Sequence, residues 1–163
     1  MGKYFLKTLT FIALVLFGLK ANADVIIDGN TNRTLIGKNV YVLQSDKELG
    51  LEDVLKTAGF KKYDKDVPNL GFSANSTWLR FTINNKSANT GLLLDVAYPI
   101  LDEVELFSPD SQGVYHGVLM GEIKPFNTRK FDHPDYIFDL NIPQNASKTY
   151  YLRVKSAEQL ILP

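Results

Sequence analysis

The stretch NSTWLRFTINN alternates polar and apolar side chains, and this period-two pattern constrains the fold more than any other feature of the sequence. Successive side chains of a β-strand point to opposite faces, so Leu79, Phe81 and Ile83 would share one face and Trp78 and Arg80 the other. The pattern predicts a strand that buries its first face in a core. It also raises a question, because the chain's one tryptophan then lies beside an arginine on the polar face.

Short alternating or β-branched runs, separated by turn residues, recur along the rest of the chain. Turn signals at intervals of about 8–12 residues indicate an antiparallel sandwich or barrel, so we predict an all-β domain. The other strands are expected at 25–28, 39–45, 91–99, 101–109, 114–123, 135–143, 147–156 and 160–163. The connection KPFNTRKFDHP is too polar, and too often interrupted by proline, to form a regular helix or strand.

One short helix is predicted between the strands at 39–45 and at 76–85. Ser45 or Asp46 would cap it, Glu48 would add negative charge to its first turn, and Gly59 would end it. Its apolar stripe would consist of Leu49, Leu51, Val54 and Leu55. Isolated helices below about 12 residues are marginal in water, so this one must pack against the sheet to form.

The first 23 residues have the pattern of a secretory signal peptide. Lys3 and Lys7 precede an apolar run that is shorter than the about 20 residues of a spanning helix, and the segment ends in the small-x-small triplet Ala21-Asn22-Ala23. We expect cleavage there, which leaves residues 24–163 as one exported domain. An uncleaved membrane anchor is the alternative.

Charge and composition exclude several classes of function. Loss of the three signal-peptide lysines leaves a mildly acidic domain, which is a poor match for nucleic acid. The chain has no cysteine and only two histidines, His116 and His133, and it lacks the Gly-x-Ser-x-Gly and phosphate-loop motifs. We therefore predict no enzyme activity, cofactor or metal site. A pair of glycosidase carboxylates stays open as an alternative, because the two residues need not be close in sequence.

The motif TWLRF has an echo in YYLRV near the end of the chain. Alternation places Tyr151 and Arg153 on one face of the second strand, as it places Trp78 and Arg80 on one face of the first. An arginine over an aromatic ring contributes roughly 0.5–2 kcal/mol. Two strands far apart in sequence therefore each present an aromatic residue and an arginine on the same face.

Four motifs in this order, NSTWLRFTINNKS, AYPILDEVELF, PFNTRKFDHPDYIFDLNIP and TYYLRVKS, are similar to those of a known receptor domain. The chain resembles the extracellular sensor domain of bacterial seven-transmembrane receptors with diverse intracellular signalling modules (7TMR-DISM). The resemblance implies a periplasmic jelly-roll sandwich similar to carbohydrate-binding modules, followed by seven membrane helices and a cytoplasmic kinase or cyclase. That apparatus is not in this sequence, so we expect a fragment, a truncated product or a free-standing sensor. Pro134 stands where family members often have a basic residue, so this chain lacks any ligand contact that such a residue makes in the family.

Eight residues are candidates for ligand binding, and each has a structural alternative. Trp78 and Tyr151 could stack on a sugar while Arg80 and Arg153 donate to its hydroxyl groups, or the chain's own first segments could cover them. Arg129 could bind an oxyanion and His133 could titrate as a switch, or both could pin their long connection.

Tyr98 and Asp102 belong to the turn in AYPILDE, together with Glu103. The carboxylates of Asp102 and Glu103 could accept hydrogen bonds from sugar hydroxyl groups or help to bind calcium. Two carboxylates are too few for a calcium site, which takes about six to eight oxygens. A solvated turn is the alternative.

We predict a periplasmic ligand-sensing domain of a membrane signalling receptor, which binds a small carbohydrate-like solute without chemistry. A partner-binding or homodimerisation module is one alternative, in which the outward aromatics meet a protein surface. An accessory domain of a glycan-processing enzyme is another.

Overall fold

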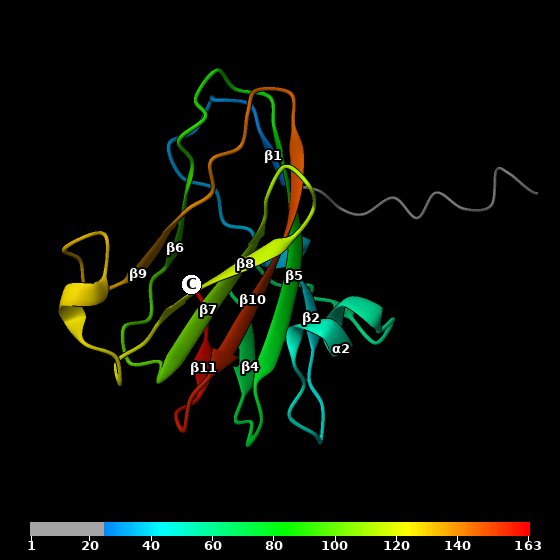
Figure 1. Ribbon diagram of the computed structural model, residues 1–163, viewed down its shortest axis with the longest axis vertical. Coiled ribbons are helices and arrows are strands. Elements are labelled where there is room, and N and C mark those ends of the chain that lie inside the picture. The colour runs from blue at the N-terminus through cyan, green and yellow to red at the C-terminus, as the bar shows by residue number, and fades with distance from the viewer. Residues whose placement is uncertain (1–24) are drawn as a thin grey trace, which may run out of the picture.

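Residues 25–163 are described by the computed structural model, and they form a two-layer β-sandwich with one short α-helix (Figure 1). The predicted all-β sandwich is therefore confirmed. The predicted signal peptide, residues 1–23, lies outside the described residues. No helix within residues 25–163 is long and apolar enough to span a membrane.

The first layer is one large sheet with the strand order β3-β2-β5-β10-β7-β8. These strands are β2 (Tyr41–Leu43), β3 (Lys61–Lys62), β5 (Thr77–Asn85), β7 (Glu103–Pro109), β8 (Tyr115–Met120) and β10 (Ser147–Lys155). Neighbouring strands along this order run antiparallel. The exception to the antiparallel expectation is β1 (Val25–Ile27), which pairs with the end of β5 in parallel.

The second layer consists of two separate two-stranded sheets. One pairs β6 (Leu93–Val96) with β9 (Tyr136–Asp139), and the other pairs β4 (Asn69–Gly71) with β11 (Leu160–Ile161). No strand pairing joins these two small sheets among the described residues. This split leaves a seam in the second layer.

The core between the layers follows from the period-two pattern. Its side chains from the large sheet include Leu79, Phe81, Ile83, Val104, Leu106, Tyr150, Leu152 and Val154, and those from the second layer include Val96, Tyr136, Phe138 and Leu160. The Tyr150 ring stacks on Phe81 with centroids 5.6 Å apart. The Tyr150 hydroxyl donates to the Leu140 carbonyl at 2.8 Å, and burial raises the pKa of Tyr150 well above its usual value.

The predicted helix is shorter than expected and begins later. Helix α2 spans only Leu51–Lys56, its N-cap is Gly50, and neither Ser45 nor Asp46 caps it. Ser45 instead accepts the amide N–H of Lys47 at 3.0 Å, which ends that stretch in a local turn. Side chains that bond their own backbone in this way compete with helix formation, so the prediction of its start was wrong.

Two of the short strands, β3 and β4, were not predicted. Each has only two or three residues, and their sequences KK and NLG lack the β-branched and aromatic residues that mark strands. Pairing with a neighbouring strand defines them, and no local signal does.

We expect Leu106→Ala to lower the free energy of unfolding by about 2–5 kcal/mol, because it opens a cavity between the layers. The matched control is Leu119→Ala on β8, where the leucine is 37% exposed and the loss should stay below about 1 kcal/mol. Urea denaturation measures both changes. Equal losses in the two variants would contradict the assigned core face.

Candidate functional site

The two echoing motifs lie side by side at the centre of the large sheet. In the register between β5 and β10, Tyr151 is opposite Arg80 and Arg153 is opposite Trp78. All four side chains belong to the outer face, since Leu79 and Leu152 occupy the core face between them. The sheet therefore brings together four of the eight predicted site residues.

The outer face is covered by the segment that runs from β2 through α2 to Phe60. Trp78 is only 1% exposed and Tyr151 only 8%. Both belong to a second buried cluster with Leu43 and Val54. Its partly buried members are Leu49, Leu51, Phe60, Phe107 and Tyr115. The indole is thus unavailable as an open stacking platform, in agreement with the alternative that the chain itself covers it.

Trp78 is held mainly by aromatic packing. Its ring stacks on Phe107 with centroids 5.4 Å apart and an interplanar angle of 24°. The indole N–H has no hydrogen-bond acceptor among the described residues. A small pocket of about 320 Å³ lies beside it, lined by Glu48, Leu49, Gly50, Leu51, Trp78, Glu105, Phe107 and Arg153.

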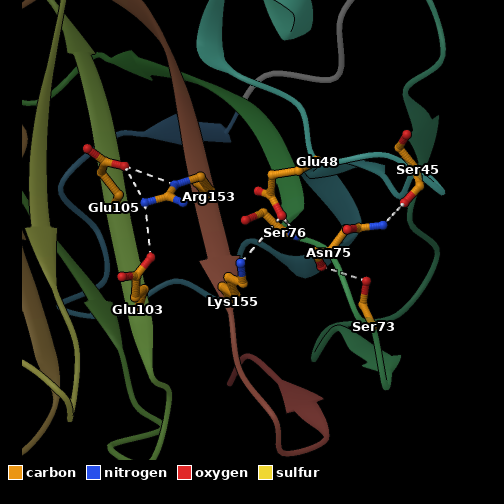
Figure 2. A network of polar contacts seen from close by, with 9 residues as sticks. All are labelled: Ser45, Glu48, Ser73, Asn75, Ser76, Glu103, Glu105, Arg153 and Lys155. Carbon is orange, nitrogen blue, oxygen red and sulfur yellow. Dashed lines mark hydrogen bonds and ion pairs between the residues drawn. The ribbon is translucent and has the colours of Figure 1, made fainter.

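Arg153 is engaged by two carboxylates of the neighbouring strand β7, as Figure 2 shows. Its Nε and Nη2 atoms each lie 2.9 Å from Glu105 Oε2, and Nη2 lies 3.2 Å from Glu103 Oε2. Lys124 also pairs with Glu103, at 3.5 Å. The guanidinium is therefore occupied by cross-strand ion pairs and half-buried, which fits a structural role.

The covering segment is fastened to the sheet by polar contacts (Figure 2). The Glu48 carboxylate accepts the amide N–H of Ser76 at 3.1 Å and lies 3.5 Å from Lys155 Nζ. Hydrogen bonding from Ser76, supported by the charge of Lys155, lowers the pKa of Glu48. Asn75 Nδ2 donates to the Ser45 carbonyl at 3.2 Å. These contacts hold the segment over Trp78.

Arg80 differs from Arg153 because it lies among rings and not among carboxylates. Its guanidinium carbon is 5.0 Å from the centroid of Tyr41 and 4.8 Å from that of Phe60. The Phe60 ring also meets Tyr151 edge-on at 6.1 Å. Arg80 is thus half-buried within an aromatic cluster.

Arg129 and His133 lie together in the long connection between β8 and β9. Arg129 Nη1 donates to the carbonyls of His133 and Pro134 at 3.1 and 2.6 Å, and the guanidinium lies over the rings of Phe126 and Tyr136. These contacts match the alternative in which Arg129 pins the connection. His133 is exposed, and its Nδ1 accepts the Asp135 amide N–H at 3.2 Å.

Tyr98 and Asp102 both lie in the connection that precedes β7. The Asp102 carboxylate accepts the amide N–H of Ala157 at 2.9 Å, which ties this turn to the end of β10. Tyr98 is half-buried against the core cluster. The eight candidates thus fall into three places, and ligand contact at any of them stays a prediction.

A larger cavity of about 590 Å³, which sequence analysis missed, lies along the seam of the second layer. Its floor includes Leu79, Phe81 and Leu152, and its walls include Leu94 of β6 and Leu162 after β11. Its polar lining residues include Thr31, Asn32, Arg33, Thr34, Asn89 and Asp95. The segment DGNTNRTLIG passes over it, and these turn-forming residues carry no signal that separates such a cover from an ordinary loop.

Comparison with protein families identifies the chain through most of its length. The family described as 7TMR-DISM extracellular 2 matches residues 37–163. The chain belongs to this family. The resemblance drawn from the sequence motifs is thereby confirmed, and the chain is an exported sensor domain of the 7TMR-DISM receptor type. A comparison with curated proteins gives no match.

The fluorescence of Trp78 tests whether the 7TMR-DISM domain covers its outer face. We expect blue-shifted emission and weak quenching by acrylamide in the folded domain, because the ring is enclosed. Leu51→Ala, which thins the cover, should increase quenching, whereas Val118→Ala on the exposed part of β8 should leave it unchanged. Quenching as strong as in the urea-unfolded chain would contradict the burial.

Arg153→Met tests the ion pairs, and we expect it to lower the free energy of unfolding by about 1–3 kcal/mol, because half-buried Glu105 loses its partner. The control is Arg33→Met, since Arg33 is 67% exposed at its side chain and lies 4.0 Å from Asp95. That change should stay within about 0.5 kcal/mol. Urea denaturation at neutral pH compares them, and equal effects would rule out a structural role for Arg153.

Proposed function

We propose that this domain senses a small carbohydrate-like solute in the periplasm, and that the solute binds in the cavity along the seam without being chemically changed. The sensor role of the family supports the first part. The cavity of about 590 Å³ is the observation that supports the second part, since it offers a ligand more room than the pocket of about 320 Å³ beside Trp78.

The size and lining of the cavity suit such a solute. Ligand sites commonly enclose about 300–1,000 Å³, and this cavity of about 590 Å³ lies within that range. Leucine and phenylalanine side chains form its floor, while hydroxyl, amide and charged groups line the segment above. A sugar has apolar C–H faces and a rim of hydroxyl groups, so it matches both surfaces.

The outer face of the large sheet is a weaker candidate for the solute. Sugar stacking there would require Trp78 or Tyr151 to leave a buried cluster, and Arg153 would have to give up two ion pairs. Each of these changes costs free energy that the ligand would have to supply. The cavity along the seam requires no such rearrangement.

The position of the cavity also suggests how binding is transmitted. Leu162 and Pro163, which follow β11, line the cavity together with Leu94 of β6. Family resemblance implies that membrane helices follow the sensor domain in these receptors. A solute in the cavity would contact β6 and the residues that follow β11, so it can favour one spacing between them. It shifts signalling only by binding one state better than another.

Titration calorimetry with neutral mono- and disaccharides tests this proposal. We expect saturable heat from at least one sugar, and Leu94→Trp, which fills the cavity, should weaken that binding about tenfold or more. The matched control Val118→Trp places the same residue on exposed β8 and should leave the affinity unchanged. No heat from any sugar, or equal affinity in both variants, would refute the proposed site.

A further inference from the structure

We propose that Arg80 is a binding site for the oxyanion of a small solute, a carboxylate or a phosphate, on the outer face of the large sheet. This site is separate from the seam cavity, because Arg80 and the cavity floor residue Leu79 point to opposite faces of β5. The proposal does not depend on the carbohydrate hypothesis.

A comparison of the chain's four arginines carries the argument. Arg153 is paired with two glutamates, Arg129 donates to two carbonyls, and Arg33 lies 4.0 Å from Asp95. The side chain of Arg80 has neither a hydrogen bond nor an ion pair within residues 25–163, and its guanidinium lies over the rings of Tyr41 and Phe60.

An aromatic face attracts a cation but accepts no conventional hydrogen bond, so the rings leave the guanidinium donors unused. A guanidinium carries five N–H donors in a planar fork that matches a carboxylate or phosphate. The two rings fix the position of this fork before any ligand arrives. Fixing a donor in advance lowers the entropic cost of binding.

On the outer face near Arg80, Glu105 is already paired with Arg153 beside Trp78, and hydroxyl groups lie on the other side along β5. Next along the outer face come Thr82 on β5 and Thr149 on β10, whose hydroxyl groups lie 2.8 Å apart. Lys62 of β3 is opposite Tyr41, so Tyr41 lies between Lys62 and Arg80 in the sheet. An anion at the guanidinium would therefore lie beside hydroxyl groups, with the positive charge of Lys62 on the strand beyond Tyr41.

The field of Arg80 reaches the neighbouring tyrosine. Burial raises the pKa of Tyr115, and the charge of Arg80 acts in the opposite direction. The Tyr115 ring packs edge-on against Tyr151 at 5.3 Å, and its hydroxyl donates to the Thr149 carbonyl at 3.3 Å. The positive charge thus acts over a patch of hydroxyl groups with no carboxylate paired to it among the described residues.

Nuclear magnetic resonance of the arginine Nε–H groups tests this site directly, because only four such signals exist. The ¹⁵N-labelled domain is titrated with sodium acetate and, separately, with inorganic phosphate at constant ionic strength. We expect a saturable shift of the Arg80 signal in at least one titration while the Arg129 and Arg153 signals stay constant. A shift with acetate alone identifies a carboxylate site, and a shift with phosphate alone identifies a phosphate site.

Two variants and a control make the result decisive. Arg80→Gln should weaken anion binding about tenfold or more, as judged from the amide signals of β5, whereas Lys130→Gln, at a lysine 66% exposed at its side chain and outside both pockets, should leave it unchanged. Phe60→Leu keeps the charge but removes one ring, and it should weaken binding about two- to fivefold even if Arg80→Gln does not fold. Absence of a saturable Arg80 shift with both anions, or unchanged binding in Arg80→Gln, would overturn the proposal.

Discussion

The antiparallel pairing of β5 with β10 is the interaction on which the rest of this domain depends. Its register sets Leu79 against Leu152 on the core face and, on the other face, Arg80 against Tyr151 and Trp78 against Arg153. Since side chains alternate with period two, a slip of one residue would move both sets to the wrong face. The core, the cover over Trp78 and the ion pairs of Arg153 with β7 all require this one alignment.

A second consequence is that the centre of the large sheet is buried on both faces. The two small sheets cover the inner face, and the segment with α2 covers the outer face around Trp78. Glu48 and Asn75 fasten that segment from opposite sides of the contact, so a helix of only six residues is held in place. The covered tryptophan is therefore part of the architecture, while the guanidinium of Arg80 keeps its N–H donors unpaired among the described residues.

Much of the fold could be predicted from the sequence because alternation is a local signal. The inward positions of Val104 and Leu106 follow directly from period-two spacing. The same spacing places the aromatic residue and the arginine of each motif, TWLRF and YYLRV, on one face of its strand. The predicted start of the helix was wrong because the Ser45 hydroxyl accepts a hydrogen bond from the Lys47 amide. The same side chain could form either a helix cap or a local turn, and the sequence does not decide between them. The cavity and the contacts of Arg80 with Tyr41 and Phe60 could not be predicted, since they depend on long-range packing.

The split of the second layer has a mechanical meaning. Because no ladder of backbone hydrogen bonds crosses between the pair β6–β9 and the pair β4–β11, the two halves can drift apart or close without unzipping any strand. Resistance to such breathing comes from side-chain packing, which deforms more gently than a hydrogen-bonded sheet. A domain with this construction has a built-in soft direction, and it runs between the pair β6–β9 and the pair β4–β11.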